Sequence, residues 1–290
     1  MTDLNSWIED FFTDLKNANR SQHTCRAYAT DLRRLAVFYD GPPAAITPAI
    51  LRDFLGTFSD LKPASRARKQ AALNSFFTWA YRQDLISANP MGKIDPIRRD
   101  PPKVRALKRS DVEKILAKIP IGRLRDRLLF RLLLETGLRV GEALALYIED
   151  LDLTPDDEHI QVKGKGGKRR TVLLDDPYLV KSLRTYLKRM EYQYGPLFRA
   201  QKNGRGGPLS YQAVQQHWKK YCDQANIQCT LHQLRHTHAT ELVNDGVSLA
   251  TIRKRLGHKN IQTTLRYAEQ TDETADAELR AWRRHKMTSH

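Results

Sequence analysis

Residues 230–270 read TLHQLRHTHATELVNDGVSLATIRKRLGHKNIQTTLRYAEQ, and this stretch decides how the second half of the chain is built. Leucine and valine recur at helical spacing over residues 231–243, and Gly246 then ends the pattern. Ser248 suits the N-cap of a second helix, which Gly257 closes, and a third short helix follows. The stretch therefore predicts three helices joined by tight turns.

The same stretch carries side chains that suit phosphate chemistry. They are His232, Arg235, His236, His258 and Tyr267. His232 and His236 stand one helical turn apart, a spacing that also suits zinc. The residue after His232 is Gln233, where a zinc protease requires glutamate, and Arg235 adds a cation beside the pair. These residues favour anion chemistry and predict no metal site.

The chain is strongly basic, and its charge is uneven along the 290 residues. Residues 1–100 hold 14 Lys and Arg against 11 Asp and Glu, a net charge of +3, whereas residues 101–290 hold 35 against 22, a net charge of +13. This excess favours a polyanionic partner, of which nucleic acid is the commonest, over a merely basic protein. The length exceeds that of a usual single domain and predicts two.

Cysteine content and hydropathy predict a cytoplasmic protein, and a nucleic-acid partner would place it with the nucleoid. Cys25, Cys222 and Cys229 are too few for a disulfide framework, and we interpret them as ordinary core or surface thiols in a reducing compartment. The acidic N-terminus lacks the pattern of a signal peptide. No apolar run reaches the length of a membrane helix, so no membrane partner is expected.

The first hundred residues predict a compact four-helix domain, because apolar residues recur at helical spacing and no strand-like alternation is present. The expected helices span 4–15, 21–39, 47–58 and 63–80. Arg66, Arg68 and Lys69 crowd into about one turn of the last helix. Adjacent cations without adjacent carboxylates form either a solvated face or a grip on phosphate, and we expect them to contact DNA.

A proline-rich, basic segment, residues 95–106, predicts an extended linker between an N-terminal domain, 1–94, and a C-terminal domain, 107–290. Its cations, also expected to contact DNA, are Arg98, Arg99, Lys103 and Arg105. Such a linker would let the two domains close around a duplex as a C-shaped clamp.

The second domain is expected to be mainly helical with one small β element. Ser110 and Glu113 fit a capping box, and Gly137 ends a buried helix over residues 123–135. Arg139 follows that glycine directly, and Glu142 lies three residues on. By themselves these two residues favour the interpretation of a routine surface ion pair.

Residues 158–174 predict a β-hairpin whose tip reads GKGGK. The tip carries Lys165 and Lys168, and Arg169 begins the return strand. It is either a solvated turn or a contact to backbone phosphate. It is not a P-loop, because no Ser or Thr follows the lysine at the start of a helix, so ATP binding is unsupported.

Five motifs in order give the chain its resemblance to a known family. TGLRVGE, GKGGK, LHQLRH, LGHKNIQTT and LRYAE resemble those of the tyrosine recombinases, or phage integrases, and the N-terminal four-helix module is similar to the family's core-binding domain. In its small size, without an added arm-binding domain, the chain resembles compact Xer-type recombinases and the resolvases or integrases of mobile elements. Many Xer proteins read Tyr-Thr-His at the nucleophile, whereas this chain reads Tyr267-Ala268-Glu269, which weakens a role in chromosome-dimer resolution.

The resemblance implies a set of site residues. The implied catalytic groups are Arg139, Lys165, His232, Arg235, His258 and Tyr267, with Glu142 and His236 in supporting positions. Tyr267 would attack the scissile phosphate, Arg139 and Arg235 would bind its nonbridging oxygens, and His258 would support the same charge. His232 would take the tyrosine proton and Lys165 would protonate the leaving 5′-oxygen, with neither metal nor ATP as cofactor.

The resemblance also implies partners. They are double-stranded DNA with inverted half-sites, further copies of the chain in a synaptic homo-tetramer, and accessory proteins or a sister recombinase. Exchange through a 3′-phosphotyrosyl bond and a four-way junction would serve integration, excision, or resolution of cointegrates or dimers. Residues 273–285 predict an amphipathic helix that docks either on its own domain or on a neighbouring protomer.

Two other classes share part of this pattern. A type IB topoisomerase would relax supercoils without a defined site, and a supercoil-relaxation assay on arbitrary plasmid distinguishes it. A non-catalytic DNA-binding regulator would need no nucleophile, and the intact set of key residues disfavours it.

Overall fold

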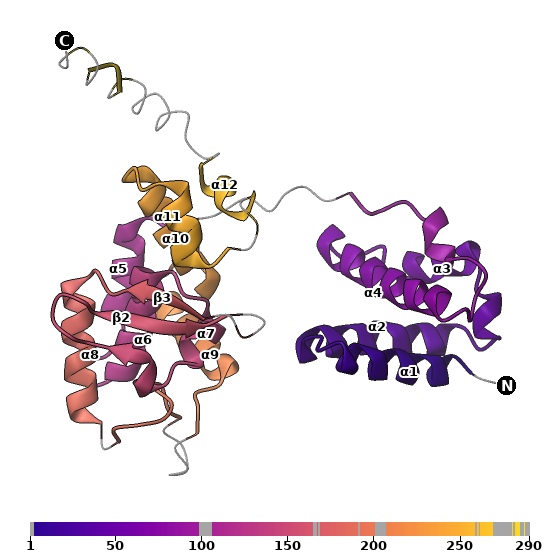
Figure 1. Ribbon diagram of the computed structural model, residues 1–290, viewed down its shortest axis with the longest axis horizontal. Helices are drawn as coiled ribbons and strands as arrows, with labels where there is room; N and C mark the ends of the chain where they lie inside the picture. Colours follow the sequence, from indigo (N-terminus) through magenta and orange to yellow (C-terminus); the bar gives the residue numbers. More distant parts are fainter. Residues whose placement is uncertain are drawn as a thin grey trace. The chain divides into compact units, whose positions relative to one another are not determined.

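The computed structural model describes residues 3–98, 106–164, 167, 169–190, 192–200, 207–258, 260, 262–268, 280, 282–284 and 287. The chain divides into two compact units, Met1–Pro102 and Lys103–His290. Both are mainly helical, and the sheet that the structure describes lies in the second, which confirms the predicted fold class (Figure 1). No helix in the described part combines the length and apolar character needed to cross a membrane.

The first unit is a helical bundle around an aromatic core. Its helices are α1 (Leu4–Asn17), α2 (Gln22–Phe38), α3 (Pro48–Gly56) and α4 (Pro63–Arg82), with short 3-10 turns at Pro43–Ala45 and Pro90–Lys93. Phe11 of α1 packs against Phe76 and Trp79 of α4. The Thr47 hydroxyl caps α3, and Pro48 occupies its first turn, where a missing N–H costs no hydrogen bond because the first turn leaves its N–H groups unpaired.

The second unit is built around α6. Its helices and strands before residue 230 are α5 (Arg109–Ala117), α6 (Leu124–Thr136), α7 (Val140–Leu144), β1 (Leu151–Asp152), β2 (His159–Lys163), β3 (Arg169–Leu173), α8 (Pro177–Arg189) and α9 (Tyr211–Gln224). Helix α6 is buried along most of its length and contacts α8 and α10. The predicted hairpin is β2 and β3, and the described sheet adds β1 in antiparallel order β1-β2-β3.

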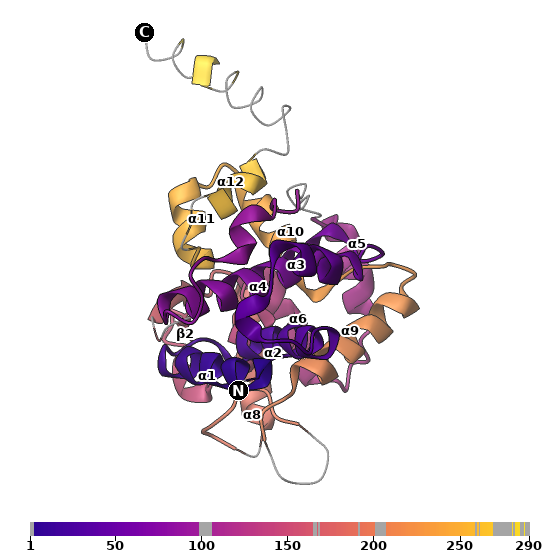
Figure 2. The same ribbon diagram turned by 90° about the vertical axis from the view of Figure 1, so that its right-hand side faces the viewer.

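Residues 230–270 fold as α10 (Leu231–Asn244), α11 (Leu249–Leu256) and α12 (Gln262–Ala268). The three helices contact one another and gather at one end of the second unit, as the two views agree (Figures 1 and 2). Ser248 caps α11 through the N–H of Thr251, and Gly257 ends it with φ +64°. These turns confirm the helix boundaries that the sequence predicted.

One predicted helix boundary is wrong. Helix α5 begins at Arg109 with Lys108 as its N-cap, and no side chain caps it. Ser110 therefore lies inside the first turn, and Glu113 is not its capping partner. The Glu113 carboxylate instead binds the guanidinium groups of Arg109 and Arg131. A charged partner offered by α6 replaces the local capping contact that the sequence suggested.

Candidate active site

Helix α10 places two histidines on one face. It begins at a capping box, in which the Gln233 side chain accepts a hydrogen bond from the Thr230 N–H at 2.8 Å. His232 and His236, one turn later, lie edge to face with their ring centroids 4.5 Å apart. Across the described residues, no group of three or more His, Cys, Asp or Glu is placed to hold a metal ion.

Tyr267 is buried beside these histidines. Only 4% of its surface is exposed, and its Oη lies 3.0 Å from His236 Nδ1. The Tyr267 ring is parallel to that of His258, with centroids 6.2 Å apart. His258 Nδ1 in turn lies 2.8 Å from Thr264 Oγ1, one turn before Tyr267 on α12. The phenol is therefore held by groups from α10 and from the end of α11.

His236, which the family resemblance placed in a supporting position, is a hydrogen-bond partner of the Tyr267 phenol. Burial, with His232 and Arg235 nearby, lowers the pKa of His236 to about 4. Burial also lowers the pKa of His232, with contributions from Arg235 and Arg139. Both imidazoles are therefore neutral near pH 7, and His236 has a ring nitrogen in position to accept the phenol proton.

Arg235 is a buried cation held by backbone. Its exposure is 2%, and its two Nη atoms donate to the carbonyl oxygens of Gly137 at 2.6 Å and Leu256 at 2.8 Å. These carbonyls lie at the C-terminal ends of α6 and α11, where helix dipoles are negative. Burial, and then the nearby Arg139, lowers the pKa of Arg235 to about 10, still well above neutrality. Arg235 therefore keeps its charge while its position is fixed.

Gly137 makes this arrangement possible. It has φ +63°, and a Cβ there would lie 2.6 Å from both His238 Cδ2 and Leu256 Cδ2. The predicted C-cap glycine therefore has two roles. It turns the chain out of α6 in the left-handed region, and it lets α10 and α11 approach closely enough for Arg235 to reach two helix ends.

Glu142 holds Arg139 at the start of α7. The Arg139 N–H donates to Glu142 Oε2 and its Nη1 to Oε1, both at 2.9 Å. Burial alone would raise the pKa of Glu142, but Arg170 and Arg139 outweigh it and lower that pKa to about 2. The Arg139 side chain remains 46% exposed, so its guanidinium can bind a further anion.

Arg170, which no sequence motif had indicated, completes this cluster. Its Nη1 and Nη2 donate to the two oxygens of Glu142 at 3.1 and 2.9 Å, and its Nε donates to the Arg255 carbonyl at 3.2 Å. Alternation along β3 turns Arg170 away from the face of its neighbour Arg169. That alternation could have indicated Arg170 from the sequence, because a charged residue on the inner face of a hairpin needs a partner of opposite charge.

A cleft of about 1200 Å³ opens beside these groups. The lining residues that the structure describes include six cations, Arg139, Lys163, Arg169, Arg170, Arg253 and Lys254, and one carboxylate, Glu142. His258 also lines it. Such an excess of positive charge suits a polyanion. Arg169, one of the predicted DNA contacts, lines the cleft. Lys165 and Lys168 lie outside the described residues.

The predicted phosphate grip on α4 needs correction. The Lys69 ammonium is buried and lies 2.7 Å from Asp31 Oδ1, and Arg68 binds both Asp31 oxygens at 2.6 and 3.1 Å. The anion between these cations is thus a carboxylate of α2, and Lys69 is not available to DNA. Arg66 is half-buried and Arg98 is exposed. The remaining predicted contacts, Arg99, Lys103 and Arg105, lie outside the described residues.

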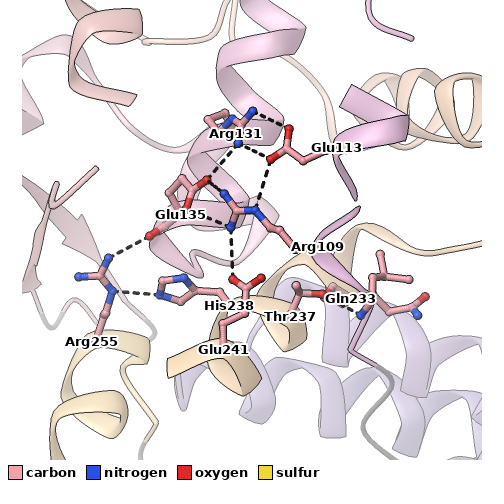
Figure 3. Close-up of polar contacts among 10 residues, drawn as sticks. Arg109, Glu113, Arg131, Glu135, Gln233, Thr237, His238, Glu241 and Arg255 are labelled. Carbon is pink, nitrogen blue, oxygen red and sulfur yellow. Dashed lines mark hydrogen bonds and ion pairs between the residues drawn. The ribbon is translucent and has the colours of Figure 1, made fainter. Parts of the chain in front are cut away.

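An ionic network fixes α10 from the side facing α5 and α6 (Figure 3). Arg109 binds Glu113, Glu135 and, at 3.2 Å, Glu241 of α10. Arg255 of α11 donates to His238 Nε2 at 3.0 Å and to the Glu135 carbonyl at 2.9 Å.

The backbone next to the predicted linker is hydrogen-bonded to α10. The Leu107 N–H donates to Thr237 Oγ1 at 2.9 Å, and Thr237 is the neighbour of His236. Helices α10 and α11 are therefore tied to α5 and α6 by contacts outside the cleft.

Comparison with known proteins assigns this arrangement to a family. A model of the phage integrase family matches residues 105–274, and one of the phage integrase N-terminal SAM-like domain matches residues 8–84. The tyrosine recombinase XerC of Myxococcus xanthus is 32% identical over 298 residues, covering 93% of this chain and 95% of the relative.

Solved structures share the fold. The XerH site-specific recombinase bound to palindromic difH substrate, in its post-cleavage complex, aligns with a TM-score of 0.73 at 22% identity, covering 91% of this chain and 81% of that one. A lambda integrase tetramer bound to a Holliday junction aligns with a TM-score of 0.74 at 20% identity, covering 90% and 78%.

Proposed function

The chain belongs to the phage integrase family, and on that premise we propose that it is a site-specific DNA recombinase of the tyrosine type. It cuts one strand by attack of Tyr267 on a phosphodiester and rejoins the strand to a new partner. The products of the first step are a 3′-phosphotyrosyl bond and a free 5′-hydroxyl. Because the covalent bond conserves the energy of the phosphodiester, religation requires no ATP.

The observation that carries this proposal is the hydrogen bond between Tyr267 Oη and a neutral histidine beside a fixed, buried arginine. His236 Nδ1 is 3.0 Å from the phenol, and Tyr267 lies close enough to Arg235 to act on its pKa. A phenol with its usual pKa of about 10 needs a proton acceptor and nearby cations to become a nucleophile. Both are in place.

Arginine side chains would stabilise the negative charge on the transferring phosphoryl group. Arg235 is held by two helix-end carbonyls and Arg139 by a carboxylate that it shares with Arg170, so neither guanidinium needs to reorganise when the substrate binds. Preorganised donors of this kind stabilise a transition state more than mobile ones. His258, beside the Tyr267 ring and on the wall of the cleft, would support the same charge.

Proton transfer would involve both sides of the phosphate. On the nucleophile side, His236 takes the Tyr267 proton, and His232, 4.5 Å away between ring centroids, passes it to solvent. On the leaving side, Lys165 at the hairpin tip would protonate the 5′-oxygen. The role of Lys165 is carried over from the family motif alone.

The working assembly would be a homo-tetramer on two DNA sites, each with inverted half-sites, passing through a four-way junction. The family membership and the alignment with a lambda integrase tetramer on such a junction support this state. Within the predicted tail helix the structure describes residues 280 and 282–284, where Trp282 is 57% exposed. A neighbouring protomer would cover it. The DNA substrate would place the enzyme with the nucleoid, in the cytoplasm.

A suicide substrate tests the proposal. A duplex half-site is first selected from a randomised pool by binding to the full chain. A set of these duplexes, each nicked next to a different candidate phosphate, is then incubated with the protein. The wild-type chain should accumulate a covalent adduct that protease releases, and Tyr267→Phe should form none. Tyr211→Phe, at an exposed tyrosine on α9, is the matched control and should behave as wild type. An adduct formed by Tyr267→Phe would show that another residue is the nucleophile.

A further inference from the structure

Two cysteines meet at the entrance to α10. Cys222, in the last turn of α9, and Cys229, in the loop that follows, have their sulfur atoms 3.4 Å apart. Cys222 is buried in the core beside Trp218, and Cys229 is partly exposed at its edge. The two thiols are free, since a disulfide requires a sulfur separation of about 2.0 Å. A movement of about 1.4 Å would join them.

The two thiols are not equivalent. The hydrogen bond between the two sulfurs lowers the pKa of the Cys229 thiol, and the same hydrogen bond, together with burial, raises the pKa of Cys222. Cys229 is therefore the more easily deprotonated of the two, and it is also the more accessible. An accessible thiol of lowered pKa next to a second thiol is the arrangement that oxidises reversibly in a reducing compartment.

We propose that Cys222 and Cys229 form a reversible disulfide and that its closure disturbs the catalytic helix. In the first step the Cys229 thiolate takes an oxygen from hydrogen peroxide, giving a sulfenic acid and, with a proton, water. In the second the Cys222 sulfur attacks the Cys229 sulfur, the S–O bond breaks, and the hydroxyl leaves with the Cys222 proton as water. The sulfurs supply two electrons and peroxide is reduced to two waters. A small-molecule thiol reverses the reaction.

The link to the catalytic helix is short. Cys229 immediately precedes Thr230, the N-cap of α10, and His232 lies in the first turn. The backbone around Cys222 is fixed, because its carbonyl accepts hydrogen bonds from the N–H groups of Ala225 and Ile227 at 3.0 Å. Closure of the sulfur gap therefore moves Cys229 more than Cys222, and it pulls on the capping box. The effect on rate, unlike the disulfide itself, rests on the proposed recombinase function.

The bond itself is tested without any activity assay. The full chain is treated with hydrogen peroxide, alkylated and digested, and the peptides are weighed. The expected product joins the Cys222 and Cys229 peptides with the loss of two hydrogens, while Cys25, which is far away in the sequence and in the other unit, is alkylated as a monothiol. Phenylarsine oxide should protect the same pair from alkylation. Oxidation of Cys25 without a Cys222–Cys229 crosslink would overturn the proposal.

The coupling is tested by cleavage of a nicked half-site before and after oxidation. The oxidised wild type should cleave about 10- to 100-fold more slowly, since a misplacement of about 1 Å in a site can cost as much as 10²-fold, and dithiothreitol should restore the rate. The double variant Cys222→Ser with Cys229→Ser should cleave equally fast with and without peroxide. A crosslinked wild type that cleaves at the unmodified rate would overturn the link to α10.

Discussion

Glu142 binds Arg170 through both carboxylate oxygens, at 3.1 and 2.9 Å, although 28 residues separate them. The same carboxylate also holds Arg139, which the family motif assigns to the phosphate. One buried carboxylate therefore sets the position of two cations at the wall of the cleft. Arg170 is a positioning residue by this geometry, because it acts on Arg139 through Glu142.

Removal of Arg170 should slow catalysis more than it weakens DNA binding. Without Arg170, Glu142 has only Arg139 to neutralise it, and the Arg139 guanidinium turns toward the carboxylate. We expect the Arg170→Ala variant to form the covalent adduct about 10²-fold more slowly in single turnover, the effect of losing one preorganised donor. Arg170→Lys should recover part of this rate, because a lysine keeps the charge without the two-pronged geometry.

Arg169→Ala is the matched control for this prediction. Arg169 lies next in sequence, is exposed and lines the cleft. Its loss should weaken half-site binding and reduce the salt dependence of that binding, while the rate at saturating DNA stays near wild type. The assignment of Arg170 fails if the two variants lose rate equally at saturating DNA.

Substitution of Gly137 should destabilise the second unit. Alanine there combines a left-handed φ of +63° with Cβ contacts of 2.6 Å to His238 and Leu256. Strained backbone of this kind costs roughly 1–3 kcal/mol, and the overlap adds to it. The urea midpoint of Gly137→Ala should therefore fall. Gly141→Ala, where nothing lies within 4 Å, should change the free energy of unfolding by less than about 1 kcal/mol.

Asp31 should matter for stability, not for DNA affinity. Asp31→Asn would leave the Lys69 ammonium buried without its countercharge, and breaking a buried ion pair in this way costs about 3–5 kcal/mol. Hydrogen exchange of the α4 amides measures the loss in the first unit. Arg68→Ala removes the more exposed partner of the same carboxylate and should cost much less. Equal losses in the two variants would contradict this account.

Acid should destabilise the second unit through its buried histidines. Burial lowers the pKa of His236 and His258 to about 4 and that of His238 to about 3. An unfolded histidine titrates near about 6.5, so below that pH the unfolded chain binds protons that the native chain does not. The free energy of unfolding is thus unaffected by these groups above about pH 6.5 and falls as the pH decreases toward about 4.

Urea titrations at about pH 7 and about pH 5 measure this dependence. His238→Asn should make the free energy of unfolding less dependent on pH by the contribution of one proton, because the variant has one fewer group to titrate. The same substitution removes the acceptor of the Arg255 Nε–H, so its stability at neutral pH should be lower than that of the wild type. A pH dependence as steep as that of the wild type would show that His238 is not among the responsible groups.

Local signals in the sequence were sufficient for most elements of the fold. Ser248 caps the helix that it was expected to cap, and Gly137 and Gly257 adopt the left-handed conformation after α6 and α11. Each of these features depends on one side chain and the turn next to it, so the sequence contains the whole cause. The order of motifs likewise indicated the family, which the comparisons confirmed.

The long-range charge partners were decided by tertiary structure alone. Asp31 is 38 residues from Lys69 and Glu142 is 28 from Arg170, and no local pattern pairs them. Cys222 and Cys229 meet because the chain folds back after α9. Tyr267 is bonded to His236 because α12 packs on that face of α10. Periodicity determines which residues share a helix face, but only packing brings two faces together, and a buried charge or thiol takes its pKa from what packing places against it.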